Sequence, residues 1–186
     1  NPFDTLNPSM TVGRQIIRAL EIFGEGKNDK TMNVTNGEIV GSILNNDKLN
    51  LTGSSAIEGD FENQGTVTGL STDTRLTLTD GTFFNNGRLR ATSGNFLTIE
   101  ADLIELGVDS DYKASEVELI GTVANSGTAD MDKDETLTGG RLNRAGGTMT
   151  VSANIDAAGY DITNEGTFLV TTDPNSVGNL TNVNNL

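Results

Sequence analysis

The sequence of 186 residues contains no cysteine, no histidine and no tryptophan, and it has only 3 prolines and 5% aromatic residues. Without cysteine or histidine, the chain has no thiol nucleophile, Ser-His-Asp triad, imidazole base or Cys/His zinc site. Any catalysis would therefore depend on carboxylates, Lys, Arg, Tyr or hydroxyl groups. Because prolines are few and Leu, Ile, Val and Phe recur throughout, the composition indicates a folded chain rather than a disordered one.

Positive charge is also scarce, with Lys+Arg 12 against Asp+Glu 26 and a formal net charge of -14. A field this negative repels phosphates and anionic lipid headgroups, so we expect no nucleic acid partner. No segment reaches the roughly 18 apolar residues that a membrane helix needs, so we expect no membrane insertion. The chain begins with Asn1 rather than Met, and we expect a processed product or an excised fragment.

A short motif recurs along the chain: an apolar residue, any residue, Asn, any residue and Gly. Clear copies lie at 61–65, 83–87, 123–127 and 162–166, and degenerate copies lie at 43–47, 103–107, 142–146 and 180–184. The spacing between successive copies is 18 to 22 residues, which indicates a repeat architecture. Because the fifth position is always Gly, Asp or Asn, we interpret it as a turn with a left-handed backbone.

Strand signals accompany each copy of the motif. Apolar and polar residues alternate ahead of it, as in Leu49-Asn50-Leu51 and Leu76-Thr77-Leu78. Alternation with a period of two, together with frequent Thr, is typical of strands separated by tight turns. The sequence therefore predicts an all-β parallel β-solenoid with about eight coils of ~20 residues, and the usual strand spacing gives a rod of about 35 to 40 Å.

The motif also predicts which side chains face inward. In one coil Phe61, Asn63 and Val67 would face the interior, and stacked asparagines would form an amide ladder. The motif places Glu105 and Arg144 on two rungs, where a charged side chain is costly to bury. At the second of these rungs, a one-residue bulge would let the neighbouring Asn143 take the place of Arg144. The predicted ladder consists of Asn45, Asn63, Asn85, Asn125, Asn164 and Asn182.

The two ends of the chain differ from the repeats. Residues 10–23 place Val12, Ile16 and Leu20 on one helical face, which predicts an amphipathic helix that caps the first coil. We therefore divide the chain into an N-terminal segment at 1–30 and a solenoid at 31–186. The last unit, at 180–186, begins and then stops, so we expect the native chain to continue or to dock on another subunit as a homo-oligomer.

Aspartates alternate with other residues after two neighbouring units. Such carboxylates could supply the oxygen ligands that Ca²⁺ requires, or they could form a solvated acidic surface. The stretch is not an EF-hand, because Glu135 stands where the loop needs Gly and Arg141 where it needs Glu. No other cofactor is expected. The candidate calcium ligands are Asp109, Asp111, Asp130, Asp132 and Asp134.

Carboxylates on adjacent coils could also form the pair that a glycoside hydrolase uses. With 26 acidic residues on a regular rod, however, such pairs arise by chance. We therefore assign no catalytic residue and expect no enzymatic activity.

The units Phe61-Glu62-Asn63-Gln64-Gly65 and Phe83-Phe84-Asn85-Asn86-Gly87 resemble the repeats of filamentous-haemagglutinin-type and autotransporter passenger β-helices. The resemblance covers about residues 34 to 186, and it implies a right-handed parallel β-helix in a secreted or surface-exposed bacterial protein, commonly an adhesin or its stalk. Phage tailspikes and polysaccharide lyases share this architecture. We expect a non-enzymatic structural or adhesive segment that contacts protein or glycan surfaces outside the cell, and the alternative is a carbohydrate-binding or carbohydrate-cleaving β-helix such as a tailspike.

Overall fold

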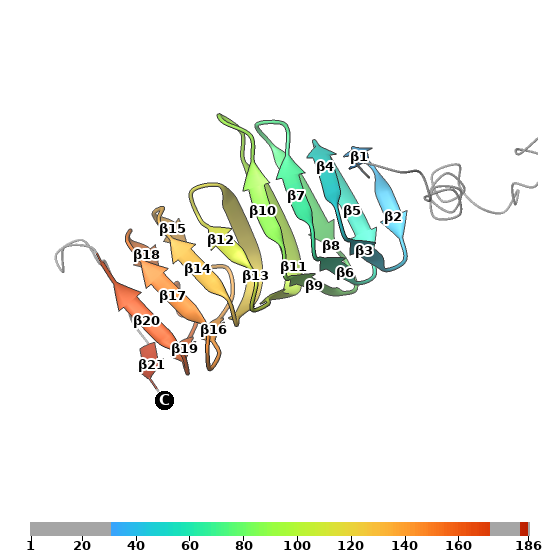
Figure 1. The fold of residues 1–186 in the computed structure, drawn as a ribbon. Helices are drawn as coiled ribbons and strands as arrows, with labels where there is room; N and C mark the ends of the chain where they lie inside the picture. Colours follow the sequence, from blue (N-terminus) through green and yellow to red (C-terminus); the bar gives the residue numbers. More distant parts are fainter. Residues whose placement is uncertain (1–30, 172–182, 186) are drawn as a thin grey trace, which may run out of the picture.

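The computed structural model describes residues 31–171 and 183–185, and these residues form an all-β parallel β-solenoid of about 7 turns. Successive coils lie side by side along a rod (Figure 1). The number of turns is slightly below the predicted eight coils, because the last coil contributes only two described strands, β20 and β21. No helix occurs among the described residues, and the predicted helix at 10–23 lies outside them.

One strand from each coil belongs to an eight-stranded parallel sheet, which we call the first sheet. Its strands alternate polar outward residues with apolar inward ones, and each pairs with the equivalent strand of the next coil. In order these strands are β1 (Thr31–Thr35), β4 (Lys48–Thr52), β7 (Thr66–Gly69), β10 (Arg88–Ala91), β12 (Asp111–Lys113), β14 (Thr128–Met131), β17 (Thr148–Val151) and β20 (Thr167–Val170).

The remaining strands form two further rows, which the long strands β11 (Leu97–Leu106) and β13 (Val117–Asn125) join into a second sheet of 11 strands. The row that follows the first sheet contains β2 (Glu38–Val40), β5 (Ser54–Glu58) and β8 (Thr74–Leu78), and the separate pair β15 (Glu135–Thr136) and β18 (Ile155–Asp156) lies at the equivalent place in later coils. The other row contains β3 (Ile43–Asn45), β6 (Phe61–Asn63), β9 (Thr82–Asn85), β16 (Arg141–Asn143), β19 (Ile162–Asn164) and β21 (Val183–Asn185).

The core is a thin column of apolar side chains inside the coils. Phe61 and Phe83 are fully buried, and their rings stack with centroids 5.2 Å apart and an interplanar angle of 3°. Strand register extends this column in both directions, through Ile43, Phe61, Phe83, Ile104, Val123, Arg141 and Ile162. An arginine therefore stands in an otherwise apolar column, between the two hydrophobic clusters of the core.

The predicted asparagine ladder is present. Four buried asparagines donate their side-chain Nδ2 to the Oδ1 of the Asn in the following coil, and the ladder asparagines also donate to turn carbonyls, as Asn85 does to that of Gly87. The amide-to-amide distances are 2.7 Å for Asn45 to Asn63, 2.6 Å for Asn63 to Asn85, 2.8 Å for Asn125 to Asn143 and 2.8 Å for Asn143 to Asn164.

Two rungs differ from the simple motif alignment. Asn143 occupies the rung in place of Arg144, which confirms the predicted one-residue alternative. Leu106, not Glu105, lies opposite Asn85, so the ladder is interrupted there and Glu105 faces outward. Asn182 lies outside the described residues, and the backbone register pairs Asn164 with Asn185.

The interpretation of the fifth motif position as a left-handed turn holds at Gly146, which has a φ of 90°, but is wrong for the clear copies of the motif. Gly65, Gly87 and Gly127 do not have a positive φ. Glycine is needed for a different reason, since a Cβ on Gly87 would overlap the carbonyl oxygen of Gly65 in the coil before it. The constraint is therefore the close stacking of successive turns rather than the handedness of one residue.

Candidate functional site

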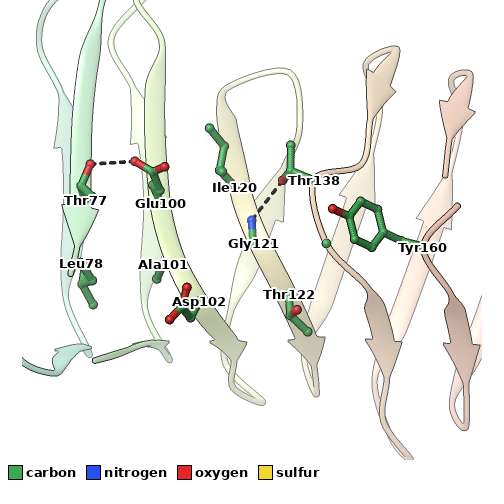
Figure 2. Close-up of a pocket in the computed structure, with 11 residues that line it drawn as sticks. Thr77, Leu78, Glu100, Ala101, Asp102, Ile120, Gly121, Thr122, Thr138 and Tyr160 are labelled. Atoms are coloured by element: carbon green, nitrogen blue, oxygen red, sulfur yellow. Dashed lines mark hydrogen bonds between the residues drawn. The ribbon is translucent and has the colours of Figure 1, made fainter. Parts of the chain in front are cut away.

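A groove of about 400 Å³ crosses the outer surface where the second sheet bends. Figure 2 shows its lining residues in coil order, from Thr77 and Leu78 at one end to Tyr160 at the other. Five successive coils contribute to it, so the groove runs along the stack of coils. The lining consists of Thr77, Leu78, Glu100, Ala101, Asp102, Ile120, Gly121, Thr122, Thr138, Gly139 and Tyr160.

The groove exists because the backbone turns sharply at this corner. The pairing of β11 with β13 shifts its register between Glu100 and Leu103, and Gly121 has a φ of 127°. The Gly121 amide donates to Thr138 Oγ1 at 3.0 Å, which ties the corners of two neighbouring coils together. A Cβ on Gly139 would overlap the Gly121 backbone, so the floor of the groove is tightly packed.

Glu100 is held in one position within the groove. Its Oε2 accepts hydrogen bonds from Arg75 Nη2 at 2.7 Å, Arg75 Nε at 3.1 Å and Thr77 Oγ1 at 3.0 Å. The hydrogen bonds from Arg75 hold the pKa of the Glu100 carboxyl below its usual value, against the opposing effect of burial. Glu100 is therefore an ionised acceptor, not a proton donor.

The other groove residues offer hydroxyl groups, a second carboxylate and one aromatic ring. Asp102, Thr122 and Thr138 are exposed, and Tyr160 is 43% exposed at the end of the groove. Such groups can exchange hydrogen bonds with a hydroxyl-rich ligand, and the Tyr ring can pack against its apolar face. Carboxylates without an adjacent free cation disfavour an anionic ligand here.

A second cavity, of about 210 Å³, lies where the first sheet turns into the row that contains β15. Lys133 Nζ lies 4.1 Å from the centroid of the Phe96 ring at this cavity. Glu118, Glu135 and Arg141 also line it, so charged groups of both signs meet at its wall.

Arg141 forms a buried polar centre beside this cavity. It is only 5% exposed, and its Nη1 donates to the carbonyls of Gly121 at 2.9 Å and Gly139 at 3.1 Å. Burial lowers the pKa of Arg141 and raises the pKa of Glu135, whose Oε1 is buried without a hydrogen-bond partner. Burial and then the charge of Glu135 raise the pKa of the Tyr112 phenol.

Sequence reasoning missed this centre because it took Leu142 as the inward apolar residue of the unit. The observed register shifts the unit by one residue, so that Arg141 faces inward and Leu142 faces outward. Arg141 is flanked by Gly140 and Leu142 and so has no apolar run around it; the available signal was Asn143, which puts position 141 at the inward start of the unit once it takes the rung. Arg144, which the motif alignment placed on a rung, reaches over one coil to form an ion pair with Glu105 at 2.7 Å.

The structure distributes the candidate calcium ligands over different parts of the coils. Asp132 accepts hydrogen bonds from the Ser115 backbone N–H at 2.7 Å and from the Ser115 hydroxyl at 2.6 Å. Asp134 Oδ1 accepts one from the Asn154 backbone N–H at 2.9 Å. Asp109 interacts with Asn86 at the turn after β11.

The other two candidate ligands, Asp111 and Asp130, lie on the strands β12 and β14 of the first sheet. Within residues 31–171 and 183–185, no three acidic residues come together as a group that could hold a metal ion. Calcium binding by these residues stays a prediction.

The fold defines this chain as a parallel β-solenoid with a groove along one corner of its coils. No family model, curated protein or solved structure matches the chain. Within residues 31–171 and 183–185 no helix has the length and hydropathy of a membrane span.

Proposed function

We propose that this chain is a non-enzymatic structural or adhesive segment of a secreted or cell-surface protein, which acts as a stalk or attaches to glycan or protein surfaces. The observation that supports this most is the groove that runs across five coils. The likeness of the repeats to filamentous-haemagglutinin-type and autotransporter passenger β-helices agrees with such a role.

The solenoid is suited to hold an extended binding surface rigid. Asparagine amides and stacked rings tie each coil to the next, so a side chain on one coil keeps its distance from the equivalent side chains on its neighbours. With a strand spacing of about 4.8 Å, five coils give a groove on the order of 19 Å long. A surface of this shape matches an extended chain better than a compact small molecule.

The chemistry of the groove favours a neutral, hydroxyl-rich chain such as a glycan. Glu100 is fixed and ionised, Asp102 is a second acceptor, and Tyr160 provides a ring at the end. Acceptors of this kind bind sugar hydroxyl groups directly, and the surrounding hydroxyls of Thr77 and Thr122 can act as donor or acceptor.

Carbohydrate cleavage is the second candidate function, because Glu100 and Asp102 face the same groove. A glycosidase needs a carboxylic acid that stays protonated, which requires a raised pKa. The lowered pKa of Glu100 argues against that role for this residue. Glu100 therefore suits accepting hydrogen bonds from a ligand better than donating a proton to one.

Binding and cleavage can be separated with a panel of neutral polysaccharides. The proposal predicts that the chain is retained on at least one polysaccharide, and that Asp102→Ala or Tyr160→Ala weakens the retention. Glu165→Ala, an exposed acidic residue outside the groove, is the matched control and should bind as the parent does. Release of reducing ends or unsaturated sugars that disappears in Asp102→Ala would establish the enzymatic alternative instead.

A further inference from the structure

The outer face of the first sheet carries positive charge on an otherwise acidic rod. Its strands contain four of the eight lysines and arginines that the structure describes but only two carboxylates, Asp111 and Asp130. We call this set the basic face, and it consists of Lys48, Arg88, Arg90 and Lys113. The formal net charge of the whole chain is -14, so the sign of this face is opposite to that of the molecule.

Strand alternation points these cations outward. Leu89 lies between Arg88 and Arg90 and is 3% exposed, whereas both arginines are exposed. Tyr112 is likewise buried beside the exposed Lys113.

Parallel register brings the cations of neighbouring coils together. Arg88 lies opposite Asp111 of the next coil. Two residues further along these parallel strands, Arg90 therefore lies opposite Lys113. Lys48 lies two coils earlier in the same column as Arg88, separated from it by Thr66. At about 4.8 Å per coil, the basic face extends about 14 Å along the rod.

Three cations of the basic face, Arg88, Arg90 and Lys113, differ from other described cations in their partners. Arg75 and Arg144 form ion pairs, Arg141 is satisfied by backbone carbonyls, and Lys133 lies over the Phe96 ring.

By contrast, Arg88, Arg90 and Lys113 form no ion pair with any described residue. Arg90 makes one long hydrogen bond, from Nε to Thr68 Oγ1 at 3.5 Å. Three exposed cations therefore keep their donors available on one flat face.

We propose that the basic face binds an acidic polysaccharide chain. This goes beyond the neutral glycan groove but rests on the proposed role in attachment. Guanidinium groups match carboxylates and sulfates through paired N–H donors, and the threonines beside them, such as Thr66 and Thr128, can hydrogen-bond sugar hydroxyls. A single polysaccharide chain running along the rod would pass all four cations in turn.

The small size of the basic face argues against duplex DNA or a membrane as its ligand. Proteins whose binding to duplex DNA depends strongly on salt make about 6 to 10 phosphate contacts, whereas this face offers four cations. A membrane or a duplex would also meet the remaining surface of a chain whose formal net charge is -14, and this charge repels it. A thin chain stays within the stripe, since screening over about 8 Å weakens the repulsion from other faces.

The experiment measures binding of the whole chain to polygalacturonate and dextran sulfate, with neutral dextran as the uncharged reference. The double variant Arg88→Gln/Arg90→Gln is expected to lose roughly tenfold in affinity at low salt. The matched control, Lys133→Gln/Arg144→Gln, changes the net charge equally on other faces and should bind as the parent does. Circular dichroism of both variants verifies that the solenoid remains folded.

Several outcomes would overturn the proposal. The first is equal affinity of the two double variants for the acidic polysaccharides. The second is binding of neutral dextran as tight as that of the acidic polysaccharides. The third is binding of duplex DNA or phosphatidylserine vesicles as tight as that of polygalacturonate. Asp102→Ala separates this proposal from the groove: it should weaken neutral glycan binding and leave polygalacturonate binding unchanged. Loss of groove binding alone would contradict the proposed groove function and leave the basic face supported.

Discussion

Asn85 donates its side-chain amide to Ser110 Oγ at 2.7 Å, although the strand register places Leu106 opposite Asn85. The turn after β11 is the cause. It contains four residues, 107–110, where the turn after β9 contains two, 86–87, and the extra length carries a buried serine into the rung. The hydroxyl thus accepts the hydrogen bond that an asparagine accepts in most other coils.

Replacing Ser110 by Ala should lower the free energy of unfolding by about 1 to 3 kcal/mol, because the buried Asn85 amide loses an acceptor. Urea denaturation followed by circular dichroism measures the change. Ser126→Ala, at a partly exposed turn position in the next coil, is the control and should stay within about 0.5 kcal/mol of the parent. Equal stability of the two variants would show that the hydroxyl does not support the ladder.

Adding a methyl group at Gly87 should also destabilise the solenoid, by about 1 to 3 kcal/mol, because Cβ would overlap the Gly65 carbonyl oxygen. Gly140→Ala is the matched control. Neither glycine has a positive φ, and the nearest atom to a Cβ on Gly140 is Asp161 O at 3.6 Å. The free energy of unfolding should therefore be lower for Gly87→Ala than for Gly140→Ala. A stable Gly87→Ala would contradict the packing explanation for the fifth motif position.

Two glutamates should change the pH dependence of stability in opposite directions. The folded-state pKa of Glu100 is lowered, so its contribution is present above its unfolded pKa and is lost as the pH falls through the folded value. Glu100→Gln should therefore reduce the free energy of unfolding at pH 7 but not at pH 2. The effect should stay below about 1 kcal/mol, because the pair with Arg75 is partly exposed to solvent.

Glu135 has a raised folded-state pKa, so ionising it costs stability as the pH rises from the unfolded toward the folded value. Glu135→Gln is therefore expected to increase the free energy of unfolding at pH 7 and to have little effect at acidic pH. Urea denaturation from pH 2 to pH 8 measures both variants. A loss of stability in Glu135→Gln at pH 7 would mean that the attraction to Arg141 outweighs burial.

Asp132→Ala tests whether this residue caps a turn or binds calcium. Loss of the hydrogen bonds to Ser115 should lower stability by about 1 kcal/mol. If Asp132 only caps the turn, the loss is the same in Ca²⁺ and in chelator. Calcium binding by the five aspartates predicts instead that Ca²⁺ raises the melting temperature of the parent and that Asp132→Ala reduces this rise. An unchanged melting temperature would contradict the calcium prediction.

The sequence was informative about the repeat because its signals are local. The spacing of the motif, the alternation around Leu49 and Leu76, and the central Asn63 and Asn85 each depend on neighbouring residues along one coil. Stacking identical coils then requires equivalent side chains to meet, which is why the inward columns and most of the ladder could be predicted.

Other features depended on how the coils fit together. A one-residue shift in register exchanged Arg141 for Leu142 inside the core, and a longer turn substituted Ser110 for an asparagine. Asn143 made the first shift one of two alternatives, but which register forms is set by the combined lengths of turns in adjacent coils.

By itself, the sequence determined that this chain is a β-solenoid with an asparagine ladder and an excess of negative charge. Only the tertiary structure decided where the groove lies, which glycines touch the coil beneath them, and that Arg88, Arg90 and Lys113 gather on one face. The physical reason is that residues about 20 positions apart become neighbours at about 4.8 Å only after the coils stack in a definite register.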